Sequence, residues 1–337
     1  MNLTSPDRTA LLAILDRFRR QKVVMLGDLV ADESIYGEIA RVSREAPVLI
    51  LKQREKQVTP GGGANAVNNL ADLGARVIPV GVIGDDEAGE ALLSYFREKE
   101  ISIRHIVRVR HRLTPTKTRI LGGVTHWQRQ QIVRVDREPA QPLASDVRAS
   151  LTRAAAALLS TSTGVLVSDY GYGTTNAREV DFLRRRIGPK PLPITIDSRY
   201  DLVSYKHLTA ATPNEPEVEA VFGMSIGNDL DRLHSLGRKF LRRQALQALL
   251  VTRGRDGMVL FEPRRAPRHL PIFGSEEAVD VTGAGDTVIA AFTLALAAGA
   301  SFLHAALLAN CAGGIVVMKR GTATVRVSEM TEVIRNA

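Results

Sequence analysis

The stretch Asp280–Phe292 most constrains what this chain can fold into, because a glycine-rich turn leads directly into an apolar helix. Gly283, Ala284 and Gly285 carry almost no bulk, so an anion can approach their backbone N–H groups at the helix N-terminus. Asp286 follows, and a carboxylate beside a phosphate site is suited to accept a proton from a hydroxyl. The alternative is a tight turn followed by an ordinary first-turn carboxylate.

The composition favours a folded protein that acts on small anions. The chain has 337 residues, 45% of them hydrophobic, which is enough for a large core. Its 45 Lys and Arg residues exceed its 36 Asp and Glu residues, giving a net charge of +9. These basic residues form no block of five or more, and aromatic residues that could stack on bases are few. We therefore expect a small-molecule partner and no nucleic acid.

The N-terminal residues 5–18 predict a capped amphipathic helix, because charges interrupt the apolar positions that a signal peptide would keep together. No apolar run approaches the roughly 18 residues of a membrane span. The single cysteine, Cys311, excludes an intrachain disulfide and a cysteine-rich zinc site. We expect a cytoplasmic protein with no membrane partner.

Buried strands and helices alternate along much of the chain, which predicts an α/β fold with a doubly wound, mainly parallel sheet in one domain, 1–337. Two more polar segments, approximately 33–59 and 106–136, alternate polar and apolar residues instead. We expect these two segments to form a small sheet over the active site. A further pair of strands around a glycine turn is predicted at 249–261.

Two places are candidates for binding an acceptor with hydroxyl groups. Asp28 follows the first buried strand, where α/β sheets place ligands, although a turn cap explains it equally well. Asn65 follows Gly62 and Gly63 in a loop that opens a helix of small residues. Its amide donates and accepts hydrogen bonds at once, which suits a polyol.

The same loop nominally matches the G-x-G-x-x-A pattern of dinucleotide folds through Gly61, Gly63 and Ala66. A polar segment precedes it where that pattern needs a buried strand, so a dinucleotide-dependent oxidoreductase is a weak alternative.

Basic residues gather on or near the second polar segment: Lys117, Arg119, Arg129 and Arg134. Even spacing places several of them on one face of a strand. A solvated face is the simpler interpretation for each one alone, but together they are suited to hold a phosphate already present on the substrate.

Asn214 and Glu217 are three residues apart at a predicted helix start, so they share one face of its first turn. They can hold a hydrated Mg²⁺ through oxygen atoms, or they can form an ordinary capping box. The turn that contains Thr252, Gly254 and Gly257 can contact nucleotide phosphates.

Four motifs resemble, in order and spacing, those of the ribokinase family, also called the phosphofructokinase-B family of sugar kinases. They are Gly61–Asp86, Asn214-x-x-Glu217, Thr252-x-Gly254-x-x-Gly257 and Asp280–Phe292. The resemblance implies a three-layer α/β/α fold with a β-sheet lid, and transfer of the γ-phosphoryl group of ATP to a sugar hydroxyl.

The resemblance also implies a role for each motif residue. Asp286 would be the catalytic base, with Gly283, Ala284 and Gly285 as the anion hole. Asn214 and Glu217 would organise Mg²⁺ through water, and Thr252, Gly254, Gly257 and Asn310 would border the nucleotide. Asp280, with Gly321 and Thr322, resembles the family's monovalent-cation loop, which implies K⁺ as a further ion.

Within that family the chain is most similar to the kinase domain of bacterial D-glycero-D-manno-heptose 7-phosphate kinases, which phosphorylate the anomeric hydroxyl during ADP-heptose synthesis for lipopolysaccharide. The segments that carry this likeness are Gly27-Asp28, Tyr36-Gly37, Arg41–Val48, Thr116–Arg119, Leu166–Tyr170 and Lys319–Val325. Asp32–Ile35 and Asp197–Tyr200 depart from the subgroup. We expect no nucleotidyltransferase domain of the kind fused in many relatives.

Alternatives to this substrate are a fructose-type or ribose-type sugar, with or without a phosphate. A non-catalytic sugar or nucleotide sensor on the same fold is a further alternative, which the intact Asp286 disfavours. A homodimer through the lid is expected by analogy, and an exposed sheet edge would motivate it.

Overall fold

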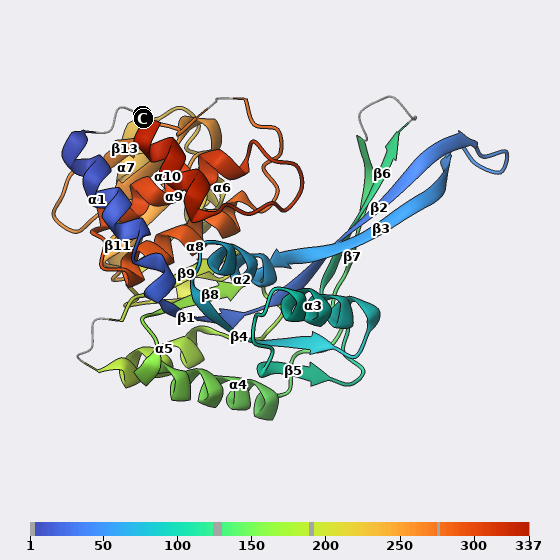
Figure 1. The fold of residues 1–337 in the computed structure, drawn as a ribbon, viewed down its shortest axis with the longest axis horizontal. Coiled ribbons are helices and arrows are strands. Elements are labelled where there is room, and N and C mark those ends of the chain that lie inside the picture. Colours follow the sequence, from blue (N-terminus) through green and yellow to red (C-terminus); the bar gives the residue numbers. More distant parts are fainter. Residues whose placement is uncertain (1–3, 124–129, 189–191, 275–276, 337) are drawn as a thin grey trace.

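The computed structural model describes residues 4–123, 130–188, 192–274 and 277–336 (Figure 1). A nine-stranded sheet runs through the body of the molecule. In spatial order its strands are β13 (Arg268–Leu270), β12 (Met258–Phe261), β11 (Ala248–Thr252), β10 (Ala210–Ala211), β9 (Ile194–Ser198), β8 (Gly164–Asp169), β1 (Lys22–Gly27), β4 (Arg76–Gly84) and β5 (His105–Val109).

In this spatial order, all neighbouring strands from β11 through β5 pair in parallel. Strands β12 and β13 extend the sheet beyond β11 by antiparallel pairing. The mainly parallel sheet predicted from the sequence is therefore confirmed. The predicted strand pair at 249–261 is the β11–β12 hairpin.

Helices cover both faces of this sheet, because its strands are apolar on both sides. In β1, Val23 and Met25 pack into one core, whereas Val24 and Leu26 pack into the other. The first core is formed with helices α1 (Ser5–Leu15), α2 (Gly63–Asp72), α3 (Glu87–Glu98), α8 (Ala284–Ala297), α9 (Phe302–Val316) and α10 (Val327–Asn336). The second is formed with α4 (Ser145–Leu158), α5 (Ala177–Ile187), α6 (Glu215–Phe222) and α7 (Leu230–Arg243).

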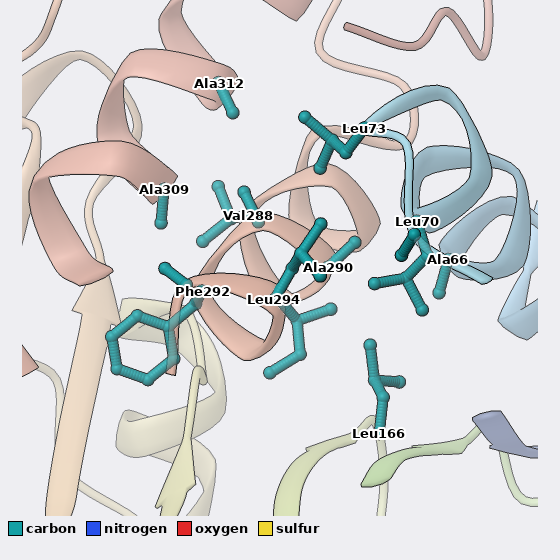
Figure 2. Close-up of a cluster of buried hydrophobic side chains, with 14 of the residues drawn as sticks. Ala66, Leu70, Leu73, Leu166, Val288, Ala290, Phe292, Leu294, Ala309 and Ala312 are labelled. Atoms are coloured by element: carbon teal, nitrogen blue, oxygen red, sulfur yellow. The ribbon is translucent and has the colours of Figure 1, made fainter. Parts of the chain in front are cut away.

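Helix α8 lies at the centre of the first core, as Figure 2 shows for its contacts with neighbouring elements. Val288, Phe292 and Leu294 of α8 lie among side chains of α2 and α9 and Leu166 of β8. The helix is apolar nearly all round, as expected for a buried helix. Its N-terminal turn is therefore held rigidly at one edge of the sheet.

A separate four-stranded sheet projects from the body, on the right of Figure 1. We call it the lid, and its strands in spatial order are β3 (Leu49–Gly62), β2 (Leu29–Val42), β6 (Thr116–Gly123) and β7 (Gln130–Arg137). One part of the expected second lid segment differs: residues 106–109 lie in β5, which pairs with β4 of the large sheet. They follow α3, so they complete a strand–helix–strand unit of the body.

Within the described residues, the longest apolar helices fall short of what is needed to cross a membrane. Cys311 is buried in α9.

Candidate active site

Asp286 lies in the first turn of α8, where the positive end of the helix faces the carboxyl edge of the sheet. The helix begins after Gly283, whose φ of 76° favours glycine. A Cβ atom at Gly283 would lie 2.5 Å from Nδ2 of Asn65, so this close approach also requires glycine. The side chain of Asp286 is 5% exposed, and burial raises its pKa to about 6 against the effect of two hydrogen bonds.

The first of these bonds comes from Asn65 of α2, whose Nδ2 donates to Oδ2 of Asp286 at 2.9 Å. Nδ2 of Asn69 donates to Oδ1 of Asn65 at 3.1 Å, and the hydroxyl of Thr287 donates to Oδ1 of Asn69 at 2.8 Å. This buried chain of side chains fixes which way each amide faces. The donor end of Asn65 is therefore directed at the carboxylate of Asp286.

The second bond comes from Tyr170, whose hydroxyl donates to Oδ1 of Asp286 at 2.8 Å. Tyr170 follows β8, in a loop held by Asp28 at the end of β1. The carboxylate of Asp28 accepts the backbone N–H groups of Tyr170, Tyr172 and Thr174 at 2.9–3.1 Å. Asp28 therefore positions the loop that brings Tyr170 to Asp286.

The predicted acceptor glycines lie next to these residues. Gly62 has a φ of 51°, and a Cβ atom there would lie 3.1 Å from the ring of Tyr170. At Gly63 a Cβ atom would lie 2.5 Å from the carbonyl oxygen of Asp28. Both glycines allow the start of α2 to pack against the loop and against β1.

Three of the four predicted lid cations lie in the described residues, and their surroundings differ. Arg119 forms an ion pair with Asp32 at 2.8 Å, and the exposed Arg134 forms one with Asp136 at 2.8 Å. Lys117 forms no ion pair with any described residue, and its Nζ lies 5.0 Å from the ring centroid of Tyr170. Burial lowers the pKa of Lys117, while the charges of Asp32 and Asp286 act in the opposite direction. Arg129 lies outside the described residues.

On the other side of the turn at 280–286 lies a cavity of about 180 Å³, which we call the nucleotide-side cavity. Its lining includes the four predicted nucleotide residues and two of the three predicted anion-hole residues: Thr252, Gly254, Gly257, Asn310, Ala284 and Gly285. A Cβ atom at Gly285 would meet nothing within 4 Å, so this residue presents its backbone to open space. Asn310 is held by a hydrogen bond from its Nδ2 to the carbonyl oxygen of Pro271 at 2.7 Å.

Asn214 and Glu217 form a full capping box at the start of α6, as the alternative interpretation expected. Each side chain accepts the other residue's backbone N–H, at 2.8 and 2.9 Å. Burial raises the pKa of Glu217. The pKa of Asp197, at the end of β9, is raised well above its ordinary value by burial and by the charges of Glu217 and Asp286.

Arg199 is the cation that opposes both of these raised pKa values. A divalent cation bound at this edge would likewise favour the ionised forms of Glu217 and Asp197. Within the described chain, no three His, Cys, Asp or Glu side chains form a ready metal cluster.

Asp280 joins two loops beside the lid. Its carboxylate accepts the backbone N–H groups of Thr282 and Gly321, each at 2.9 Å. Burial acts to raise the pKa of Asp280, but these hydrogen bonds keep the pKa below its ordinary value. Asp280 and Thr282 line a cavity of about 890 Å³ together with Asp32 and Arg119 of the lid. We call it the lid-side cavity, and the turn at 280–286 borders both cavities.

The sequence interpretation missed Tyr170, which bonds Asp286, and Asn69, which bonds Asn65. Tyr170 directly follows Asp169 at the end of a predicted strand, so its position at the carboxyl edge was a signal. Asn69 lies one helical turn after Asn65, which places both on one face of α2.

Comparison with known families and structures gives a consistent assignment. Residues 20–329 match the family model described as pfkB family carbohydrate kinase. The chain is 36% identical to the bifunctional protein HldE of Pelobacter propionicus and 37% identical to that of Mesorhizobium japonicum, with 97% of this chain covered in each case. It spans 66% and 64% of the lengths of these relatives.

Solved structures share the fold at low sequence identity. Arabidopsis thaliana ribokinase complexed with ribose and ATP has a TM-score of 0.70 at 20% identity, covering 94% of this chain and 99% of that one. Escherichia coli phosphofructokinase-2 in complex with potassium has a TM-score of 0.73 at 16% identity, covering 94% and 98%. These likenesses show the ribokinase-like fold.

Proposed function

Because the chain belongs to the pfkB family of carbohydrate kinases and is an ATP-dependent carbohydrate kinase, we propose that its acceptor is a sugar that already carries a phosphate. The favoured acceptor is D-glycero-D-manno-heptose 7-phosphate, giving the 1,7-bisphosphate for ADP-heptose and lipopolysaccharide core synthesis. The short segments shared with heptose 7-phosphate kinases and the identity with HldE proteins support this choice.

The observation that carries the proposal is the place of Lys117. It is a partly buried cation without an ion pair among the described residues, and it lies over Tyr170, which is bonded to the base. A buried cation is costly unless an anion compensates it. An anionic group on the acceptor, or the phosphoryl group in transfer, would supply that charge.

In the proposed reaction, Asp286 takes the proton of the acceptor hydroxyl. The hydroxyl oxygen then forms a bond to the γ-phosphorus of ATP, and the bond from that phosphorus to the β–γ bridging oxygen breaks, which releases ADP. Backbone N–H groups of Gly283 and Gly285 are suited to stabilise the charge on the transferred group, whereas that of Ala284 donates to the carbonyl oxygen of Val281 at 3.2 Å.

Two ions complete the proposal. Glu217 and Asn214 would hold Mg²⁺ through water, which would neutralise charge on the ATP phosphates. Asp280, tied to the loop at Gly321, would belong to a K⁺ site. We also propose a homodimer through the lid, since its exposed residues include Val42, Leu49 and Val133.

A coupled assay of ADP release tests the acceptor across heptose 7-phosphate, fructose phosphates, ribose and nucleosides. We expect the highest kcat/KM with heptose 7-phosphate. Activity on only unphosphorylated sugars would overturn the proposal that the acceptor carries a phosphate. If a fructose phosphate is the best substrate, only the choice of heptose 7-phosphate would be overturned. ATP binding in calorimetry without transfer to any sugar would favour the sensor.

A further inference from the structure

We propose a second ligand site at the opposite edge of the large sheet, which binds an organic phosphate. A cavity of about 550 Å³, here called the amino-edge cavity, lies where β1, β4 and β5 begin. The first residues of these three neighbouring strands are Lys22, Arg76 and His105, and all three line the cavity. Lys22 and Arg76 are direct partners in the β1–β4 register.

The cations of this cavity have little local compensation. Arg76 and the adjacent Arg104 form no side-chain hydrogen bond or ion pair with any residue that the structure describes. Lys22 donates from Nζ to the hydroxyl of Thr161, which carries no charge. Burial lowers the pKa of His105, and the charges of Arg104 and Lys22 lower it further, as expected where positive charges crowd together.

Acidic residues nearby do not balance this charge. Lys99 also lines the cavity, but its Nζ is held by Asp72 at 2.7 Å, so that pair is neutral. Glu100 is the remaining acid in the lining. The C-terminal ends of α2 and α3 also face this edge, and their partial negative charge is another reason for cations to lie here. That charge acts only within the last helical turn, and it does not explain why a cavity is present.

The shape of the cavity indicates the class of ligand. Its volume is in the range of small-molecule sites, roughly 300–1,000 Å³. Apart from Ser102, the rest of the lining is apolar, and it includes Ala71, Val77, Ile78 and Leu158. A phosphate would meet the arginines while an organic group covers the apolar surface.

This site is separate from the catalytic one. Lys22 and Gly27 are the two ends of β1, and six strand residues span about 17–20 Å. The base and its partners lie at the carboxyl end of that strand, beside Asp28. The proposed sugar kinase reaction uses none of the residues of the amino-edge cavity.

Calorimetric titration of the full chain with phenyl phosphate, and separately with inorganic phosphate, tests the site. The variant Arg76→Ala/Arg104→Ala removes two of its charges. The matched control Arg242→Ala/Arg243→Ala removes two exposed charges of α7 elsewhere on the surface. We expect phenyl phosphate to bind about tenfold more weakly to the first variant, with wild-type binding in the control and unchanged kcat in both.

Equal binding by the wild type and both variants would overturn the site, as would equal loss in both variants. Equal affinity for inorganic and phenyl phosphate in the wild type would overturn the organic ligand. If the double variant fails to fold, the single variant Arg104→Ala, which changes an exposed side chain, takes its place. Weaker binding of phenyl phosphate than in the control would then support the site, and equal binding would overturn it.

Discussion

Nδ2 of Asn65 lies 2.9 Å from Oδ2 of Asp286, which joins the first turns of α2 and α8 across the catalytic edge of the sheet. Each residue follows a glycine turn, and the two turns are more than 200 positions apart in the chain. The bond to the carboxylate stabilises its ionised form, whereas burial favours the neutral form. The balance sets the pH at which Asp286 can act as a base.

The acid limb of the pH–rate profile should report this balance. The pKa of Asp286 is raised to about 6, so the base becomes protonated as the pH falls through that value. We expect kcat/KM to fall by about tenfold per pH unit below 6, because only the ionised carboxylate accepts the proton. A profile measured from pH 4.5 to 8 checks this. A flat profile down to pH 5 would show that the pKa is not raised.

Replacing Tyr170 with Phe removes one donor to the base and nothing else from the ring. We expect kcat/KM at neutral pH to fall by roughly 10- to 100-fold, since a hydrogen bond to a charged group is lost. The acid limb should also move to higher pH, because that bond lowers the pKa of Asp286. Tyr172→Phe is the matched control, as its hydroxyl bonds the exposed Glu138. Equal profiles for both variants would refute the role of Tyr170.

Replacing Lys117 with Met removes a cation beside the base while it keeps a long apolar stem. We expect the KM for a phosphorylated acceptor to rise by about tenfold or more, with a smaller change in the KM for ATP. Arg54→Met is the control, because Arg54 is an exposed cation of the lid that is paired with Glu38 and has no proposed role in binding. Steady-state kinetics of the three proteins decide. A rise in the KM for ATP alone would reassign Lys117 to the nucleotide phosphates.

Gly285 allows a graded test of the nucleotide-side cavity. A Cβ atom there would meet no atom of the protein within 4 Å, so Ala should fold normally while it fills space needed by a phosphate, and Val would fill more of that space. We expect kcat/KM for ATP to fall by on the order of 10²-fold or more with Val, and by less with Ala. Melting temperatures should match the wild type. Full activity of Gly285→Val would exclude phosphate from this position.

Local sequence patterns were enough to predict most of the fold and part of the site. The apolar strands and the glycine turn before Asp286 follow from neighbouring residues, and the structure has them in the expected order. The turn at Thr252–Gly257 and the distant Asn310 meet in one cavity, as the family resemblance implied.

The remaining contacts depend on pairs of residues that only the fold brings together. Asp28 was a candidate acceptor ligand, but its oxygens accept N–H groups more than 140 residues away. The hydrogen bond between Tyr170 and Asp286 also joins residues far apart in the chain, at a separation of 116 positions. Lys117 and Arg119 have the same charge and lie two positions apart on one strand. They differ because Asp32 of the neighbouring strand pairs with Arg119. Spacing within a strand contains none of this information.

The rate of phosphoryl transfer by Asp286→Asn tests most directly the central claim that Asp286 is the catalytic base. The amide keeps the size of the side chain and can still accept a hydrogen bond, but it cannot take a proton. Single-turnover transfer from ATP to heptose 7-phosphate should slow by on the order of 10²–10⁴-fold, while the calorimetric Kd for ATP stays near that of the wild type. Near-normal transfer by Asp286→Asn would contradict the account, because the base would then have to be another group.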